Sequence, residues 1–126
     1  MPKILVVDDN EKNLKLFRLI ISSMGFETLT ATDGQEGVRL AKEKLPDLIL
    51  MDIQMPKMDG YAALNALRSG ENTKAIPAIA LTAYAMRGDR ERLLEYGFTD
   101  YISKPIEKEG FIKTIREALK LDREGA

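Results

Sequence analysis

The chain has 126 residues, the length of one domain, and its 44% hydrophobic and 31% charged residues are typical of a folded protein rather than a disordered one. With 19 basic and 20 acidic residues the net charge is -1, so the composition does not favour direct binding to nucleic acid or to an anionic membrane. The lack of cysteine and histidine excludes disulfides, thiolate metal sites, most zinc sites and a phosphohistidine on this chain, which leaves carboxylates, hydroxyls, lysine and hard metal ions for any chemistry.

Short apolar runs alternate with stretches of helical periodicity along the chain. Lys3–Val7 predicts a buried strand, and apolar residues at helical spacing predict a helix from Glu11 to Met24, which Gly25 ends. Phe26–Ala31 alternates as a second strand, and Thr32-Asp33-Gly34 caps the next helix. The residues expected to face inward on that helix are Val38, Leu40, Ala41 and Leu45.

The second half of the chain continues the same alternation. Leu48–Met51 predicts a third strand that stops at Asp52, and Asp59-Gly60 predicts a turn after it. The later elements are strands over Ala78–Leu81 and Asp100–Ser103 and helices over Tyr61–Leu67, Arg87–Tyr96 and Lys108–Leu121. Apolar strands separated by helices predict a single α/β domain over residues 1–126, in which a five-stranded parallel sheet is covered by helices on both faces.

Polar side chains of a few particular types follow the predicted strands. They are Asp8 and Asp9 after the first strand, Asp52 after the third, Thr82 after the fourth and Lys104 after the fifth. Doubly wound sheets bind ligands outside the carboxyl ends of their strands, near the point where the strand order reverses. We therefore expect three carboxylates, a hydroxyl and an ammonium to converge on one patch.

Each of these residues also has a purely structural interpretation. Asp8 or Asp9 could cap the first helix, Asp52 and Thr82 could cap turns, and Lys104 could be an exposed surface residue. These interpretations do not explain why such groups follow several strands of one sheet. The convergence therefore favours a functional site.

Three clustered carboxylates require compensation, because unit charges about 4 Å apart repel by ~4 kcal/mol at an effective dielectric constant near 20. Lys104 offsets part of this repulsion, and a divalent cation would offset the rest. Oxygen donors favour Mg²⁺ as that cation. A carboxylate beside Mg²⁺ and a lysine is a favourable acceptor for phosphoryl transfer, and aspartyl phosphate is a known covalent intermediate.

The motifs that surround these residues match a family. They are "ILVVDDN", "ATDGQEGV", "DLILMDIQMPKMDG", "IPAIALTAYA" and "DYISKPI", in this order. With them the chain resembles the receiver domain of bacterial two-component response regulators over essentially its whole length. The resemblance implies a CheY-like, flavodoxin-like (βα)5 fold with the strand order 2-1-3-4-5.

The resemblance also implies the roles of the site residues. Asp52 would accept a phosphoryl group from a phosphohistidine on a sensor histidine kinase or a histidine phosphotransfer protein. Asp8 and Asp9 would hold Mg²⁺, for which Mn²⁺ substitutes, Asp9 directly and Asp8 through water. Asp52 itself and the backbone carbonyl of Gln54 would complete the protein ligands. Lys104 would contact the phosphoryl oxygens.

Further positions match residues that control switching and phosphate lifetime in the family. Thr82 matches the switch hydroxyl, and Tyr101 matches the aromatic residue that moves inward with it. Lys104-Pro105 matches a peptide bond that is usually cis. The residues implied in access to the phosphoryl group and in its lifetime are Gln54, Ala83 and Tyr84.

Together these features predict a phosphorylation-activated switch rather than an enzyme that turns over external substrates. It would catalyse its own phosphotransfer and autodephosphorylation. Phosphorylation would change the face formed by the fourth helix, fifth strand and fifth helix, which binds a downstream effector. We expect no direct contact with nucleic acid or membrane. Met1-Pro2-Lys3 leads straight into a strand, so we expect no signal peptide and a cytoplasmic protein.

Three alternatives stay open. A magnesium-dependent phosphohydrolase uses similar atoms, but usually with a D-x-D pattern where this chain has adjacent Asp8-Asp9. A phosphate-independent interaction module would be expected to lack a site residue. The domain could also belong to a larger protein, because "DIQMPKMDG" and "LTAYAMRGD" are similar to receivers of hybrid kinases as well as to stand-alone cell-division regulators of the DivK type. A start at Met1 and an end at "LDREGA" favour a stand-alone regulator or an N-terminal receiver.

Overall fold

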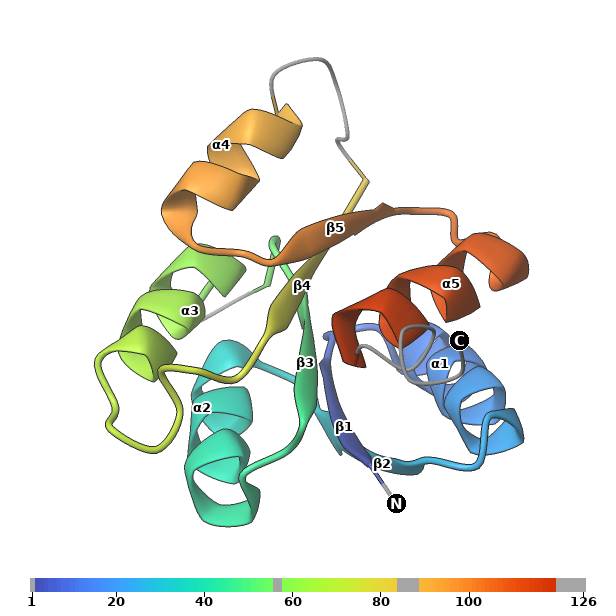
Figure 1. Cartoon of the computed structure of the whole chain (residues 1–126), viewed down its shortest axis with the longest axis horizontal. Coiled ribbons are helices and arrows are strands. Elements are labelled where there is room, and N and C mark those ends of the chain that lie inside the picture. The colour runs from blue at the N-terminus through green and yellow to red at the C-terminus, as the bar shows by residue number, and fades with distance from the viewer. Residues whose placement is uncertain (1, 56–57, 84–88, 120–126) are drawn as a thin grey trace.

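The computed structural model describes residues 2–55, 58–83 and 89–119, and in these residues five strands alternate with five helices (Figure 1). The strands are β1 (Lys3–Val7), β2 (Glu27–Ala31), β3 (Leu48–Asp52), β4 (Ala78–Thr82) and β5 (Asp100–Ser103). The helices are α1 (Glu11–Ser23), α2 (Gly34–Lys44), α3 (Gly60–Arg68), α4 (Asp89–Tyr96) and α5 (Lys108–Leu119). Within the described part of the chain, no helix is both long enough and apolar enough to cross a membrane.

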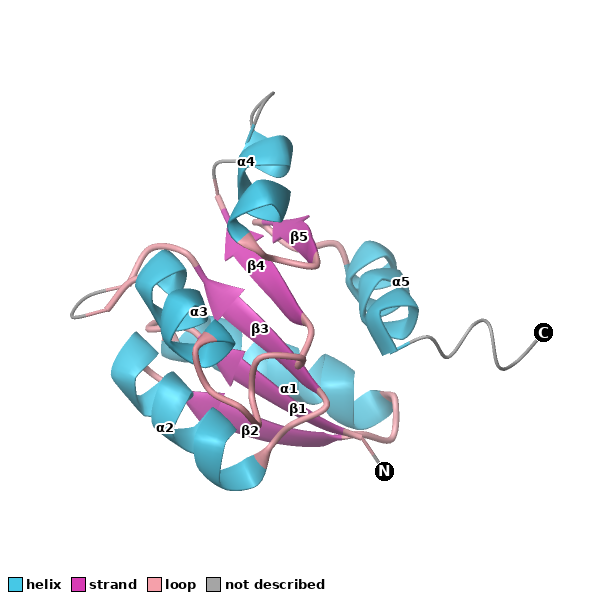
Figure 2. Cartoon of the chain, turned by 60° about the vertical axis from the view of Figure 1, so that its left-hand side comes forward, coloured by secondary structure: helices cyan, strands magenta, loops and turns pink. Residues whose placement is uncertain are grey.

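The strands form one parallel sheet in the order β2-β1-β3-β4-β5, which confirms the predicted fold class and strand order. All strand arrows point the same way in Figure 2. The chain leaves β1 toward β2 at one edge and then returns to place β3 on the other side of β1. The strand order therefore reverses between β1 and β3, where this class of sheet forms its binding crevice.

Alternate residues of each strand supply two separate cores. In β1, Ile4 and Val6 pack with α1 and α5, whereas Leu5 and Val7 pack toward α2, α3 and α4. Figure 1 shows the same division, with α1 and α5 on one side of the sheet and α2 and α3 on the other. The central strands are buried from both sides, which explains why their sequences are continuously apolar.

Short polar side chains begin three of the helices. Asn10 caps α1 by accepting hydrogen bonds from the backbone nitrogens of Lys12 at 2.9 Å and Asn13 at 3.2 Å. Asp33 caps α2 and Asp59 caps α3 in the same way. Since Asn10 provides the cap of α1, the side chains of Asp8 and Asp9 are available for another role.

Several predicted boundaries and orientations need correction. Leu45 was expected to face the core, but its φ of 46° closes α2 in the left-handed conformation, and its side chain is 46% exposed. The third strand includes Asp52, which pairs with Leu81, and the fourth strand includes Thr82, so each is one residue longer than predicted. Three predictions fall outside the described residues: the role of Tyr84, the start of the fourth helix at Arg87 and the end of the fifth helix at Leu121.

Candidate functional site

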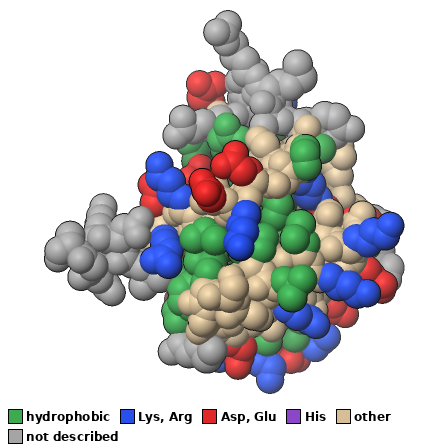
Figure 3. Space-filling model, turned by 90° about the vertical axis from the view of Figure 1, so that its right-hand side faces the viewer, with side chains coloured by type: hydrophobic (Ala, Val, Ile, Leu, Met, Phe, Trp, Pro, Cys, Tyr) green, Lys and Arg blue, Asp and Glu red, His purple; other side chains and the backbone are tan. Residues whose placement is uncertain are grey.

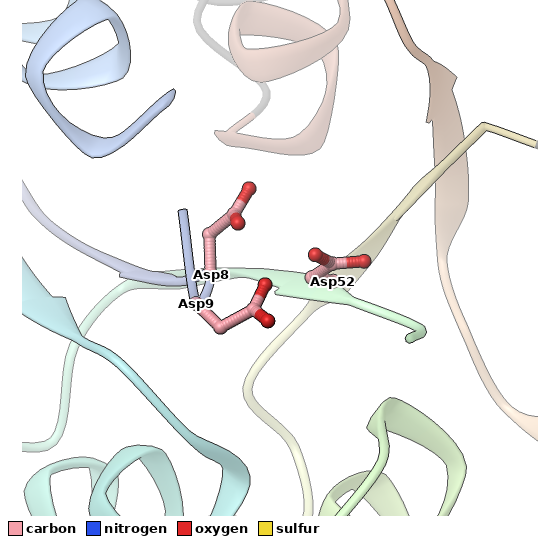
Figure 4. A group of neighbouring side chains, drawn as sticks. All are labelled: Asp8, Asp9 and Asp52. Atoms are coloured by element: carbon pink, nitrogen blue, oxygen red, sulfur yellow. The ribbon is translucent and has the colours of Figure 1, made fainter. Parts of the chain in front are cut away.

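The carboxyl ends of β1 and β3 bring three carboxylates together. Asp8 and Asp9 directly follow β1, and Asp52 is the last residue of β3. One oxygen from each carboxylate lies within 4.8 Å of the other two. Figure 4 shows the side chain of Asp9 reaching toward Asp52, with Asp8 beside them. Asp8 and Asp52 are buried, whereas Asp9 is exposed and leaves the cluster open to solvent.

Lys104 joins two of these carboxylates from the end of β5. Its Nζ lies 3.0 Å from Oδ2 of Asp52 and 3.1 Å from Oδ2 of Asp8. The backbone nitrogen of Lys104 donates to the carbonyl oxygen of Thr82 at 2.8 Å, which fixes the start of the loop after β5 against the end of β4. The peptide bond between Lys104 and Pro105 is cis. The structure thus brings Lys104 and the three carboxylates into one group.

Burial and charge act against each other in this group. Burial raises the pKa of Asp52 above its ordinary value of 3.8, although Lys104 and the backbone of Gln54 counteract the shift. Burial alone would lower the pKa of Lys104, but its hydrogen bond to Asp52 and the charges of Asp52 and Asp8 outweigh burial and raise that pKa. Lys104 therefore stays protonated, and one ammonium does not balance three carboxylates.

The loop after β3 is packed tightly against the backbone of Asp52. The backbone nitrogen of Gln54 donates to Oδ1 of Asp52 at 3.1 Å, so both carboxylate oxygens have a donor. The backbone nitrogen of Gly60 donates to the carbonyl oxygen of Ile53 at 3.0 Å. A Cβ atom at Gly60 would lie 2.6 Å from the carbonyl oxygen of Asp52. Only glycine allows α3 to begin so close to the acidic strand end.

The donor set suits a hard divalent cation. Asp8, Asp9 and Asp52 offer carboxylate oxygens from three side chains, and the chain contains no thiolate or imidazole that would favour a softer metal. The excess negative charge of the group is the physical reason to expect a cation. The residues therefore fit Mg²⁺.

The other predicted residues that the structure describes lie on β4 and β5 and in the loops after β3 and β4. Thr82 is a buried residue at the end of β4, and Tyr101 on β5 is partly buried. Tyr101 pairs with Ala80, which is two residues before Thr82, so Thr82 and Tyr101 belong to the same face of the sheet. Gln54 and Ala83 are exposed, and Tyr84 lies outside the described residues.

Two asparagines around Asp8 were not predicted from the sequence. The backbone nitrogen of Asn10 donates to Oδ1 of Asp8 at 2.9 Å, and Nδ2 of Asn13 donates to Oδ2 of Asp8 at 3.2 Å. Both lie where α1 begins, a few residues after β1, which ends at Val7. An amide in the first turn of a helix, a few residues after a buried aspartate, is the signal that would have identified Asn13.

Comparison with known proteins shows the family of the chain. A model of the response regulator receiver domain matches residues 4–116. The chain belongs to the response regulator receiver family. The polar-differentiation response regulator DivK of Brucella anthropi is 48% identical over 120 residues, which cover 94% of this chain and 98% of that protein. DivK of Brucella ovis is 47% identical over 116 residues, covering 92% of this chain and 94% of that protein.

Solved receiver domains share the fold. The receiver domain of a sensor histidine kinase from Pseudomonas aeruginosa, crystallised with magnesium coordinated in its active site cleft, has a TM-score of 0.87 and 36% identity, and the match covers 94% of this chain and 98% of that one. A chemotaxis response regulator of Vibrio cholerae has a TM-score of 0.88 and 29% identity over the same shares of the two chains. The protein is therefore a phosphorylation-dependent switch of a two-component system, and such receivers work with histidine kinases or phosphotransfer proteins and with effectors.

Proposed function

We propose that residues 1–126 form one receiver domain in which Asp52 accepts the phosphoryl group in a reaction that requires Mg²⁺. The observation that carries this proposal is the position of Asp52. It is the carboxylate that contacts Lys104 through one oxygen and the Gln54 backbone through the other, while Asp8 and Asp9 lie beside it. Asp52 is thus held in a fixed orientation between a cation and a candidate metal site.

The chemical step is a transfer of phosphorus from nitrogen to oxygen. A carboxylate oxygen of Asp52 attacks the phosphorus of a phosphohistidine on the partner; an O–P bond forms and the N–P bond breaks. The released histidine keeps the electron pair of the broken bond. Lys104, already 3.0 Å from Asp52, is placed to bind an oxygen of the transferred group and to neutralise its charge.

Asp8, Asp9, Asp52 and the backbone carbonyl of Gln54 are the groups that would hold the metal ion. When bound, Mg²⁺ supplies Lewis-acid stabilisation of the negative charge on the phosphoryl oxygens. Mn²⁺, which accepts the same oxygen ligands, is proposed as a substitute. The buried position of Asp8 and the exposed position of Asp9 leave one open side from which ion and donor enter.

The same residues support autodephosphorylation by water. The side chains of Gln54 and Ala83 are exposed beside the site, and the small side chain of Ala83 leaves the acceptor accessible. We place control of phosphate lifetime on these two residues and on Tyr84. In the phosphorylated protein a water molecule attacks the phosphorus, the O–P bond to Asp52 breaks, and the Asp52 carboxylate and inorganic phosphate are released.

Switching is proposed to pass through Thr82 and Tyr101 to the face of α4, β5 and α5. Thr82 is joined through its backbone to Lys104, and Tyr101 lies on the same face of the sheet as Thr82. A groove of about 390 Å³ along β5 and α5 includes Tyr101 in its wall. A shift of Tyr101 would change this groove, so we place the effector there. A Thr82→Ala variant that takes up phosphate and still shows the full wild-type change in effector affinity would refute this coupling.

The histidine-bearing partner is proposed to dock at a separate groove, on α1 and the start of α5. An apolar groove of about 300 Å³ lies there, and its wall includes Leu19 of α1, which is 71% exposed, and Ile106, two residues after Lys104. Figure 3 shows hydrophobic side chains between Lys and Arg side chains on this side of the molecule. Leu19→Asp should slow phosphotransfer from the protein donor but leave labelling by the small donor acetyl phosphate unchanged. Equal slowing with both donors would contradict this docking surface.

The central proposal is tested by incubating the protein with acetyl phosphate and following its intact mass. We expect the mass of one phosphoryl group to be added in the presence of Mg²⁺, and no addition in Asp52→Asn or after chelation of the metal. Labelling that persists in either control would overturn the assignment. We also propose a cytoplasmic location, because the phosphohistidine of the partner is made from ATP, which is found in the cytoplasm.

A further inference from the structure

The structure gives Asp8 a second side-chain donor besides Lys104. Oδ2 of the buried Asp8 faces both Nζ of Lys104 at 3.1 Å and Nδ2 of Asn13 at 3.2 Å. Its other oxygen accepts from the backbone nitrogen of Asn10 at 2.9 Å. Because a carboxylate only accepts hydrogen bonds, the amide of Asn13 must present its nitrogen, and the contact fixes the rotation of the carboxylate.

Asp8 and a phosphoryl group on Asp52 would compete for Lys104. In the unphosphorylated protein it bridges Asp8 and Asp52 at 3.1 and 3.0 Å. A phosphoryl group on Asp52 would bring further oxygen acceptors to Lys104, and these would compete with Asp8 for its ammonium group. Asp8 is fully buried, so the loss of the Lys104 hydrogen bond at Oδ2 would cost free energy, and the Asp8 carboxylate could then rotate away from its position.

We propose that Asn13 is a positioning residue of the site: its amide holds Asp8 in place so that Lys104 can move from Asp8 to the phosphoryl group. The amide is neutral, so it satisfies Oδ2 of Asp8 without adding a positive charge that would compete with the metal ion. Its own position is fixed, because its backbone nitrogen donates to the capping side chain of Asn10 at 3.2 Å. The inference rests on the proposed function and adds a residue to its site.

The test is Mg²⁺ binding, measured by calorimetry on the full chain without any phosphodonor. Asn13→Leu, which removes the donor without opening the site to water, should raise the dissociation constant for Mg²⁺ about tenfold, the size of effect expected for a group that orients a metal-binding carboxylate. The matched control is Asn65→Leu, at an exposed asparagine of α3 on another helix, and it should bind Mg²⁺ as the wild type does. An Asn13→Leu variant with wild-type affinity would overturn the inference.

A double-mutant cycle separates positioning from a general loss of stability. Asn13 and Lys104 share one oxygen of Asp8, so the loss of affinity caused by Asn13→Leu should be at least twofold larger in the Lys104→Met background than in the wild type. Equal losses in the two backgrounds would show that Asn13 does not act through the shared oxygen. Asn13→Ala is measured in parallel, so that a folding defect specific to the leucine variant does not decide the result, and it must show the same coupling.

The outcome for Asn13 is distinguishable from the outcome for the proposed function. If the wild type neither binds Mg²⁺ nor takes up phosphate, the proposed function fails. If the wild type does both, Asp52→Asn blocks labelling and the Asn13 variants match the wild type, then only the role of Asn13 fails.

Discussion

The excess negative charge at the end of β1 and β3 predicts an unusual response to the substitution Asp9→Asn. At the outer limit of 4.8 Å, two unit charges repel by about 3.5 kcal/mol at an effective dielectric constant of 20 and by about 0.9 kcal/mol in water. Asp9 is exposed, so the smaller value applies to its repulsion with each of Asp8 and Asp52. Attraction to Lys104 offsets part of the sum. The net gain from removing the charge of Asp9 is about 1 kcal/mol.

Metal-free Asp9→Asn should therefore unfold at a higher temperature than the wild type, by roughly 3–6 °C for a domain of this size. The order should reverse when Mg²⁺ is added. The wild type gains about 1.4 kcal/mol when the ion is present at ten times its dissociation constant, whereas the variant lacks one ligand and gains much less. Thermal unfolding followed by circular dichroism, with chelator and then with Mg²⁺, measures both effects.

A neighbouring acidic residue provides the control. Glu11 is exposed in the first turn of α1, where a negative charge stabilises the helix, so Glu11→Gln should lower the unfolding temperature slightly and keep the full response to Mg²⁺. The reasoning is wrong if metal-free Asp9→Asn is less stable than the wild type. It is also wrong if the variant gains as much from Mg²⁺ as the wild type.

Three further predictions concern stability. Because burial raises the pKa of Asp52, the ionised carboxylate lowers the stability of the folded protein, so metal-free Asp52→Asn should be more stable than the wild type at neutral pH in urea titrations. This difference in stability should shrink as the pH falls through the raised pKa and should vanish below about 3.8, the ordinary pKa. A difference that stays constant with pH would contradict the reasoning. Gly60→Ala should lower the free energy of unfolding by about 1–3 kcal/mol in the same titrations, because the added Cβ would meet the carbonyl oxygen of Asp52. Gly110→Ala in α5 is the control: its Cβ meets nothing within 4 Å, so it should raise the free energy of unfolding by about 0.5–1 kcal/mol. Arg68→Met should lower the free energy of unfolding by about 1–3 kcal/mol, because the carbonyl oxygen of Ile76 loses its 2.7 Å hydrogen bond from Nη1. Arg68→Lys should recover only part of this loss. An Arg68→Met variant as stable as the wild type would refute the prediction.

The strands and the parallel sheet could be predicted because the physical signals are local and repeated, whereas the strand order followed from the resemblance to receiver domains. Each strand is an apolar run bounded by polar or turn residues, and parallel strands joined by helices leave few possible topologies. The same logic placed Asp8, Asp9 and Asp52 at one edge of the sheet. The structure shows them within 4.8 Å of one another. The sequence therefore predicted at which end of the strands these groups meet.

The errors and omissions arise where a local signal is ambiguous or a partner is distant. Asp8, Asp9 and Asn10 are all good helix caps, and only the burial of Asp8 at the sheet edge leaves the cap to Asn10. Leu45 fits a helical apolar stripe, but the left-handed turn that closes α2 redirects its side chain to solvent. In the sequence Asn13 looks the same as any polar helix residue, because its function depends on its hydrogen bond to Asp8, which only the structure shows.

The strand lengths show a third kind of omission. The hydrogen bond from the backbone nitrogen of Ile53 to the carbonyl oxygen of Leu81, at 3.1 Å, continues the ladder between β3 and β4 past the last apolar residue. Asp52 is therefore a strand residue with a buried side chain, although its carboxylate made it look like the first loop residue. Pairing between strands, which a single sequence does not display, decides where each strand ends.

The most direct test of the central claim is to locate the phosphoryl group on the chain. The protein is phosphorylated with acetyl phosphate and Mg²⁺, reduced with borohydride to convert the acyl phosphate into a stable alcohol, digested and mapped by mass spectrometry. The account predicts one modified residue, Asp52, and no modification when the metal is chelated. Modification at Asp8 or Asp9, or modification of Asp52 that proceeds equally well without a divalent cation, would contradict it.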